Sequence, residues 1–363
     1  MQNKPNSLYI HIPFCAHICS YCDFTKLFYF QKYEEPYLKA LFKELDSYSI
    51  DKVDTIYIGG GTPTSLSDEG FEKLLSKVAP YFGGKEFTVE ANVENLTKEK
   101  LNIMKKYGVT RLSIGVESTS NKLLKEIGRH HSFEDAANAV KLAKNAGFNN
   151  INVDLIYGFE GETIEDLKND VKNLLSLDVD HISTYSLIVE PGSIFFNKGK
   201  KEQNEEDSRK FYEYILSELR KNGYERYEVS NFARNKKYSL HNMTYWKNEE
   251  YYGCGLGASG YVNGIRYTNT KNLDDYITGK TVSEKEKVTK EMELEYFLLT
   301  NLRMEQGFFK KDFKDKFGID FEAKFGEKIK QNKLEKLIEI GDIIHLTDDG
   351  ILLMDFVILK LIN

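Results

Sequence analysis

Short apolar runs alternate with helix-periodic stretches along roughly the first 220 residues. An apolar run of about four to eight residues between turn signals predicts a buried strand, whereas apolar positions three and four apart predict an amphipathic helix. Helical patterns such as EEPYLKALFKELDSY, FEDAANAVKLAKNAG and TIEDLKNDVKNLLSL separate the apolar runs. The predicted strands are SLYIHI (7–12), VDTIYIG (53–59), FTVEAN (87–92), RLSIGVE (111–117), NINVDLIYG (150–158) and HISTYSLI (181–188).

Capping residues fit this alternation. Ser67 and Thr97 precede helical stretches as N-caps, and Gly108, Gly147 and Gly223 follow others as C-cap residues. Strands that alternate with helices form parallel βαβ units. Six such units could form either an open doubly wound sheet or a partial TIM-type barrel, and periodicity alone leaves both open.

The alternation of strands and helices ends after residue 223, so we predict that the chain has three parts. Residues 1–223 form the parallel α/β core, and residues 224–285 form a connecting region of strands and loops that carries HNMTYW (241–246). Residues 286–363 form a smaller α+β domain, in which helices precede DIIHLTDDGILLMDFVI. We interpret that last stretch as a β-hairpin that turns at Asp-Asp-Gly, which makes the domain winged-helix-like.

Composition narrows the class of protein. The 363 residues are 41% hydrophobic and 13% aromatic, which is enough for a sizeable core. A formal net charge of −6 does not favour nucleic acid as a partner. No apolar run reaches membrane-spanning length, and MQNKPNSLYIHI lacks the pattern of a signal peptide. We therefore expect a cytoplasmic protein.

Three of the four cysteines, Cys15, Cys19 and Cys22, form C-x3-C-x2-C directly after the first strand. The carboxyl ends of parallel strands are where α/β proteins build their sites. Three thiolates without a fourth partner suit a cuboidal iron–sulfur cluster with one open iron. Zinc is the main alternative, with His11 or His17 as fourth ligand, and reduced cysteines without a metal are a third. We interpret the isolated Cys254 as a packed core residue.

The cysteine spacing, with an aromatic residue before the last cysteine, resembles the signature of the radical S-adenosylmethionine (SAM) enzymes. Its flanks, YIHIPFC and CDF, resemble the branch that holds the oxygen-independent coproporphyrinogen III oxidases (HemN) and the heme chaperones (HemW). The resemblance extends over nearly the whole chain, through GGGTPTSL (59–66), VEANVENLT (89–97), RLSIGVES (111–118), IGRHHS (127–132), NINVDLIYGFEGET (150–163), YEVSNFA (227–233) and HNMTYW. It implies a partial (β/α)6 barrel, a [4Fe–4S] cluster on Cys15, Cys19 and Cys22, and SAM bound to the open iron. One electron from the cluster then cleaves SAM to methionine and a 5′-deoxyadenosyl radical.

The resemblance also implies roles for residues at the strand ends. Gly59, Gly60, Gly61 and Thr62 match the segment that contacts the methionine part of SAM, and glycines permit that close approach. Glu90 and Asp154 match positions that contact the ribose. Arg129 matches an arginine that pairs with the SAM carboxylate, which suits a guanidinium.

Three further positions carry weaker implications. Glu117 stands where the oxidases usually have glutamine and could still accept a hydrogen bond. Tyr9 matches a tyrosine that packs near the cluster. His130 and His131 receive no role.

Two departures separate the chain from the oxidases. Phe24 occupies the position of a further cysteine in the oxidases, and only six residues precede the first strand. Both departures favour the heme chaperones, as does HNMTYW. In that motif His241 is a candidate axial heme ligand, since imidazole is a common ligand of heme iron; a buried cluster that only packs the second domain is the alternative.

The expected function is therefore heme binding and delivery to apoproteins, such as respiratory cytochromes near the cytoplasmic membrane. The expected state is a monomer or a cofactor-dependent homodimer. Oxidation of coproporphyrinogen III is the alternative function, and a radical SAM reaction on an unrelated substrate is a third.

Overall fold

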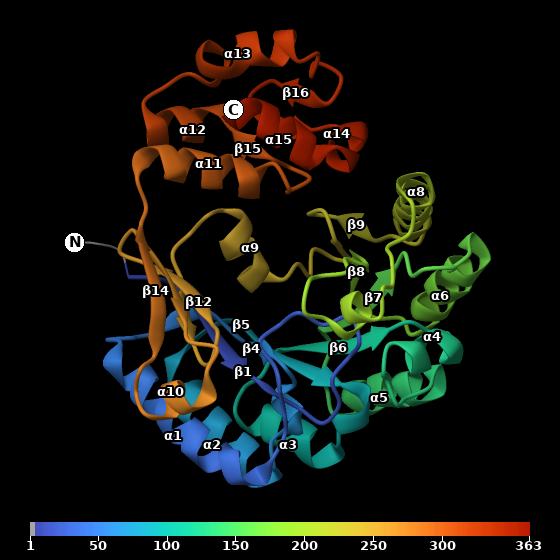
Figure 1. Ribbon diagram of the computed structural model, residues 1–363, viewed down its shortest axis with the longest axis vertical. Coiled ribbons are helices and arrows are strands. Elements are labelled where there is room, and N and C mark those ends of the chain that lie inside the picture. The colour runs from blue at the N-terminus through green and yellow to red at the C-terminus, as the bar shows by residue number, and fades with distance from the viewer. Residues whose placement is uncertain (1–3) are drawn as a thin grey trace.

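A nine-stranded sheet forms the centre of the computed structural model, which describes residues 4–363 (Figure 1). The strand order is β11-β1-β4-β5-β6-β7-β8-β10-β9. The six central strands pair in parallel, each with its successor. Each overlaps a predicted strand, although β5 begins earlier and β8 ends earlier than predicted: β1 (Ser7–Ile12), β4 (Val53–Gly60), β5 (Phe82–Asn92), β6 (Arg111–Glu117), β7 (Ile151–Tyr157) and β8 (His181–Ser186).

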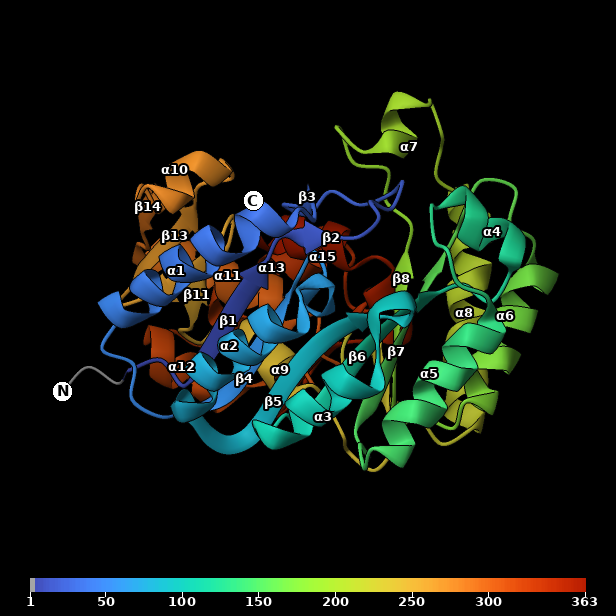
Figure 2. The same ribbon diagram turned by 90° about the horizontal axis from the view of Figure 1, so that it is seen from below.

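Helices cover the outer, convex side of the curved sheet (Figures 1 and 2). They are α1 (Gln31–Ser47), α2 (Asp68–Val78), α3 (Lys98–Lys106), α4 (Asn121–Glu126), α5 (Phe133–Asn145), α6 (Ile164–Ser176) and α8 (Glu205–Lys221). Because helices cover one side and side chains fill the other, a central strand such as β6 is buried along its whole length. The sheet keeps two free edges, at β11 and β9. The expected fold class, an α/β partial barrel with a smaller C-terminal domain, is confirmed.

The predicted caps lie where the sequence places them. The Ser67 hydroxyl accepts a hydrogen bond from the Gly70 amide at 3.0 Å, and the Thr97 hydroxyl accepts one from Lys100 at 3.2 Å. Gly108, Gly147 and Gly223 follow their helices with φ values of 80°, 86° and 79°. In this left-handed region glycine avoids the Cβ clash that other residues meet.

Residues after 223 return to the central sheet. Strands β9 (Glu225–Arg226) and β10 (Asn231–Ala233) extend it beside β8, and β11 (Tyr252–Cys254) pairs in parallel with β1. A second sheet, β12 (Ser259–Val262), β13 (Ile265–Asn269) and β14 (Val282–Lys287), follows, with α10 (Leu273–Ile277) between its last two strands.

HNMTYW is helical, which differs from the strands and loops expected there. It forms α9 (Leu240–Trp246), and the hydroxyl of its N-cap, Ser239, accepts a hydrogen bond from the Asn242 amide. The Glu86 carboxylate accepts hydrogen bonds from the amides of Leu240 and His241, at 2.9 and 3.1 Å. The negative side chain thus satisfies the unpaired N–H groups at the helix start. Since Glu86 lies in the first half of β5, α9 packs against the amino-terminal part of the barrel strands.

The C-terminal domain combines helices with a small antiparallel sheet, in the order β15-β17-β16. Its elements are α11 (Lys290–Asn301), β15 (Phe308–Phe309), α12 (Lys310–Phe317), α13 (Phe321–Gln331), β16 (Ile338–Ile340), β17 (Ile343–Leu346), α14 (Asp348–Leu352) and α15 (Met354–Ile362). None of the helices in the described part of the chain is long and apolar enough to cross a membrane.

The predicted position of the terminal hairpin is wrong. The hairpin lies earlier, between β16 and β17, and Asp-Asp-Gly begins α14. Thr347 is the physical reason, because its hydroxyl accepts a hydrogen bond from the Gly350 amide at 3.0 Å and caps a helix there. Asp348 and Asp349 occupy the first turn, where the helix dipole favours acids.

Candidate functional site

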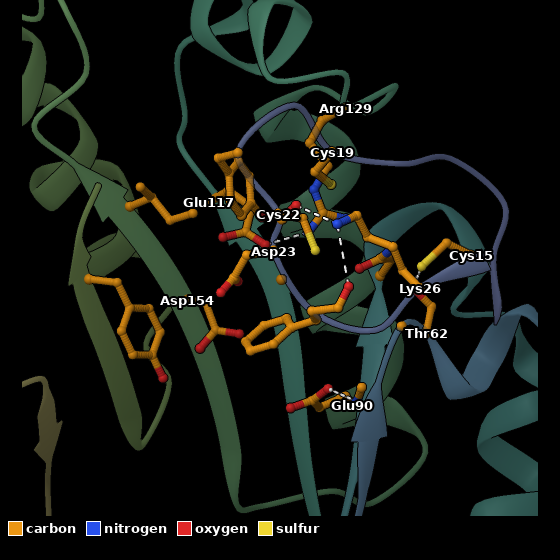
Figure 3. Close-up of a pocket in the computed structure, with 18 of the residues that line it drawn as sticks. Cys15, Cys19, Cys22, Asp23, Lys26, Thr62, Glu90, Glu117, Arg129 and Asp154 are labelled. Carbon is orange, nitrogen blue, oxygen red and sulfur yellow. Dashed lines mark hydrogen bonds and ion pairs between the residues drawn. The ribbon is translucent and has the colours of Figure 1, made fainter. Parts of the chain in front are cut away.

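The carboxyl ends of the central strands open into one cavity of about 390 Å³ (Figure 3). Most of the predicted site residues line it, although they come from separate motifs: Cys15, Cys19, Cys22, Gly60, Gly61, Thr62, Glu90, Glu117, Arg129 and Asp154. Gly59, Tyr9 and His241 are not among its lining residues. The structure therefore brings ten of the thirteen predicted residues together.

The cysteine loop begins at β2 (Phe14–Cys15), which pairs with β3 (Leu27–Phe28) and closes the loop between them. Burial raises the pKa of all three thiols, that of Cys15 to about 11, so that without a metal they stay protonated. A bound metal takes the place of those protons. Among residues 4–363, no three His, Cys, Asp or Glu side chains are grouped closely enough to hold a single metal ion. A cuboidal cluster is wider than one ion and can bridge thiols that stand farther apart.

His11 and His17, the candidate fourth ligands for zinc, differ in their surroundings. His11 is buried, and its ring nitrogens bond to the Tyr9 hydroxyl at 2.9 Å and the Thr25 carbonyl at 2.7 Å. Burial lowers its pKa to about 4, so the ring is neutral. His17 is exposed, and its ring makes a tilted contact with that of His130, with ring centroids 3.9 Å apart.

The glycines after β4 are required by close contacts. A Cβ on Gly59 would lie 2.6 Å from the Glu90 carboxylate, and one on Gly61 would lie 2.7 Å from the Pro13 backbone. Gly60 has φ +111°, and its amide donates a hydrogen bond to Glu90 at 3.0 Å. Contacts within the protein therefore require these glycines, and Gly60 and Gly61 line the cavity where the resemblance places the methionine part of SAM.

Three carboxylates from neighbouring strands face the cavity. Glu90 accepts a hydrogen bond from the Tyr57 hydroxyl at 2.6 Å, and Asp154 accepts one from Asn152 at 2.7 Å. Burial, and then the charges of Glu117 and Glu90, raise the pKa of Asp154 to about 7. Burial also raises the pKa of Glu90. Paired hydrogen-bond acceptors of this kind suit ribose hydroxyls, and a cationic ligand would relieve their mutual repulsion.

Arg129 supplies the positive charge of the cavity. It is 8% exposed and forms ion pairs with Glu117 and, at 4.0 Å, with Glu94. Its Nε, like the Glu94 Oε2, is buried without a hydrogen-bond partner in the described chain. Buried polar atoms are normally satisfied, so these two atoms favour a missing polar ligand. His131 bonds to Glu94 and to the Val116 carbonyl, each at 3.2 Å, and so helps to fix Glu94 beside Arg129.

Tyr9 and His241 lie together and are not among the lining residues of the cavity; Tyr57, which bonds to the lining residue Glu90, neighbours both rings. Their rings are 6.5 Å apart, and the Tyr9 hydroxyl bonds to His11. His241 is fully buried, with Nδ1 2.9 Å from the Thr55 hydroxyl and Nε2 2.7 Å from the Tyr245 hydroxyl. Burial lowers its pKa to about 3. Coordination of heme iron by His241 stays a prediction, and from this conformation it would require α9 to move and at least one of these bonds to break.

Sequence reasoning missed several lining residues. Asn92 donates a hydrogen bond to the Thr62 hydroxyl at 2.9 Å, and Ser113 contacts the Asn152 amide at 2.8 Å. Each lies on a predicted strand, Asn92 two residues after Glu90 and Ser113 four residues before Glu117. Alternation along the strand was the signal that could have found them. Lys26 and Tyr185 also line the cavity and carried no comparable signal.

Two known protein families match parts of the chain. Residues 9–174 match the model of the radical SAM superfamily, and residues 288–353 match the HemN C-terminal domain. The chain is therefore a radical SAM protein, with the [4Fe–4S] cluster and SAM that define this class. Its cysteine loop, glycine segment and unsatisfied arginine fit those two groups.

More specific relatives cover the whole chain. The heme chaperone HemW of Lactococcus lactis is 42% identical over 362 residues, which is 96% of this chain and 95% of that protein. The HemW of Bacillus subtilis is 40% identical over 96% of both chains. The protein belongs to the HemW family. The solved structure of the Escherichia coli coproporphyrinogen III oxidase HemN has the same fold, with a TM-score of 0.87 at 21% identity over 99% of this chain and 90% of that one.

Proposed function

We propose that the protein is a heme chaperone, which binds heme and transfers it to apoproteins. The observation that carries this proposal is the 42% identity to a heme chaperone over nearly the full length of both chains. Phe24, at the position where the oxidases have a further cysteine, supports it. A cytoplasmic location of the protein and acceptors near the membrane, such as respiratory cytochromes, belong to this proposal, as does a monomer or a cofactor-dependent homodimer.

In this proposal the chain's own residues hold the two cofactors of the class. Cys15, Cys19 and Cys22 are the cluster ligands, and Gly60 presents its backbone to the methionine part of SAM. When bound, the cluster would supply one electron to SAM. Glu90 and Asp154 accept hydrogen bonds from the ribose hydroxyls, and Arg129 pairs with the carboxylate of SAM.

Two side chains orient the carboxylates of Glu90 and Asp154 and do not contact the ligand themselves. Tyr57 donates a hydrogen bond to Glu90, and Asn152 donates one to Asp154, so each carboxylate is held toward the cavity. The network orients the acceptors before the ligand arrives, which reduces the ordering that binding requires.

The test separates heme transfer from oxidase chemistry. The reconstituted, cluster-loaded protein is titrated with heme under anaerobic conditions, and the loaded protein is then mixed with an apo-cytochrome. We expect a Soret band and its passage to the acceptor, without SAM-dependent release of carbon dioxide from coproporphyrinogen III. Sustained release of carbon dioxide would instead assign the oxidase reaction.

A further inference from the structure

Only two of the seven histidines have ring nitrogens without a hydrogen-bond or ion-pair partner in the described part of the chain: His17 and His130. In each of the other five, both ring nitrogens have such a partner: His11, His131, His181, His241 and His345. A heme iron takes an imidazole nitrogen as axial ligand. His17 and His130 are the two histidines that can offer one without losing an existing bond.

These two histidines lie side by side at the edge of the cavity, and of the two only His17 is among its lining residues. Both are exposed, and their ring centroids are 3.9 Å apart with planes inclined at 35°. His17 belongs to the cysteine loop and lines the cavity. His130 follows Arg129, so the histidine pair joins the two segments that border the cavity on this side.

Large apolar side chains surround the same mouth. Phe24, Tyr185 and Ile188 line the cavity and are 63%, 41% and 60% exposed. Ile194 and Phe196, also exposed, follow on α7 (Ile194–Asn197), which stands out from the barrel at this end (Figure 2). The Phe195 amide donates a hydrogen bond to the Ser20 carbonyl at 2.9 Å, which ties α7 to the cysteine loop. A gathering of exposed apolar side chains beside a cavity indicates a ligand surface.

A cation without an acidic partner completes the mouth. Lys26 lines the cavity, and its Nζ donates to the carbonyls of Cys22 and Phe24. These two carbonyls are the hydrogen-bond partners of its Nζ, which forms no ion pair with a carboxylate among residues 4–363. A lysine in this position can pair with the carboxylate of an otherwise apolar ligand.

We propose that this mouth is the heme site of the protein, with His17 as the iron ligand. Phe24, Tyr185 and Ile188 pack on the porphyrin, and Lys26 pairs with a propionate. Heme is the occupant that matches the whole set, because it joins a flat apolar ring, two carboxylates and an iron that accepts imidazole. The proposal rests on the proposed chaperone function and assigns its ligand site, at the carboxyl ends of the strands rather than at the buried His241.

The experiment titrates heme into cluster-loaded protein and follows the difference spectrum against the same protein without heme. We expect His17→Ala to weaken heme binding at least tenfold and to shift the Soret band. Added imidazole should restore the band position, which a purely structural defect would not allow. His345→Ala, on the C-terminal domain, is the matched histidine control and should behave as the wild type.

Two precautions keep the result interpretable. His17 lies between cluster ligands, so iron and sulfide are measured, and His17→Gln, which keeps a polar side chain there, is compared at equal cluster content. The double variant Phe24→Ser/Ile188→Ser should weaken heme binding severalfold while the Soret position stays that of the wild type, because the ligand remains.

Three outcomes would overturn the assignment. One is an unchanged heme spectrum and affinity in both His17 variants. Another is loss of the Soret shift in His241→Ala alone. The third is unchanged heme affinity in Phe24→Ser/Ile188→Ser together with lost binding to anionic lipid vesicles, which would make the mouth a membrane surface. If the wild-type protein binds no heme at all, the proposed function itself fails, which is a distinguishable result.

Discussion

Arg129 and Glu117 form a buried ion pair at the carboxyl end of β6. The register between β6 and β7 shifts between Gly115 and Glu117, and Glu117 has φ 68°, in the left-handed region. Non-glycine residues adopt this conformation at a cost, and they do so mostly where the surroundings fix them. Here the bulge places the Glu117 carboxylate against the guanidinium that should receive the carboxylate of SAM.

The ion pair predicts that Glu117→Gln binds SAM more tightly. The Glu117 carboxylate competes for Arg129, and glutamine removes that competition while keeping a hydrogen-bond acceptor. We expect a gain of about tenfold in affinity, which corresponds to about 1.4 kcal/mol. The unliganded variant should lose about 1–3 kcal/mol of stability, because Arg129 loses a charged partner. Calorimetry measures the SAM affinity and thermal unfolding measures the stability, and Glu162→Gln, at a buried position, is the control. Weaker SAM binding would show that Glu117 contacts the cofactor itself.

Arg129→Ala should weaken SAM binding by about 1–3 kcal/mol, the usual scale for a lost charge-assisted hydrogen bond. The measurement is calorimetric titration of the cluster-loaded protein with SAM. Arg234→Ala is the matched control, since that side chain forms a surface ion pair with Asp178 at 2.8 Å. Equal SAM affinity in the two variants would contradict the role that the resemblance assigns to Arg129.

Cys15→Ser, Cys19→Ser and Cys22→Ser should each prevent assembly of an intact cluster, whereas Cys254→Ser should retain it. Cys254 is fully buried on β11, beside β1, and does not line the cavity. Iron, sulfide and the brown absorbance after anaerobic reconstitution are the readouts. Full cluster content in Cys19→Ser, or tightly bound zinc in the wild type, would refute the assignment.

Asp154 should make stability depend on pH. Because its folded pKa is raised to about 7, above the value of about 4 in an unfolded chain, the folded protein holds this proton more tightly. Well below pH 4 both states are protonated, so the group makes no pH-dependent difference between them. As pH rises from about 4 to 7 the unfolded state ionises first, so stability falls, by up to about 4 kcal/mol for a shift of this size.

The test compares wild type with Asp154→Asn between pH 5 and 7.5 in the absence of SAM. The wild type should lose stability across this range relative to the variant, by urea unfolding. Asp342→Asn, at an exposed position, should follow the wild type. Parallel curves for wild type and Asp154→Asn would mean that Asp154 is ionised throughout.

The hydrophobic pattern predicted the six barrel strands, whereas most of the ten cavity residues were predicted from the family resemblance. Strands buried on both sides appear as continuous apolar runs, and parallel strands bring their carboxyl ends to one edge. The parallel strands explain why Glu90, near the end of β5, and Asp154, in the middle of β7, face one cavity, but their assignment to the site came from the family resemblance.

Long-range contacts explain what could not be predicted. HNMTYW has little helical periodicity, and it is helical because Ser239 and Glu86, more than 150 residues apart, together satisfy its first amide groups. The terminal hairpin was misplaced because the Asp-Asp-Gly turn signal competes with the capping signal of Thr347. The ring contact between His17 and His130 joins two loops that no local pattern connects.

Glu86→Ala should loosen α9 without disturbing the cavity at the other end of the strands. The carboxylate accepts hydrogen bonds from two amides at the start of α9, so its loss leaves them unpaired and costs about 1–2 kcal/mol of stability. Hydrogen–deuterium exchange over residues 239–246 should rise. Iron and sulfide content should stay at the wild-type level, because the cluster ligands are at the opposite end of β1 from Ser7, which contacts α9 through Thr244 at 2.8 Å. Glu72→Ala, a surface residue paired with Lys106, serves as the control. Heme affinity in Glu86→Ala then separates the two candidate heme ligands. If the affinity rises, and the gain disappears in Glu86→Ala/His241→Ala, His241 is a heme ligand that α9 covers. Unchanged heme affinity in Glu86→Ala supports the heme site at the mouth of the barrel instead.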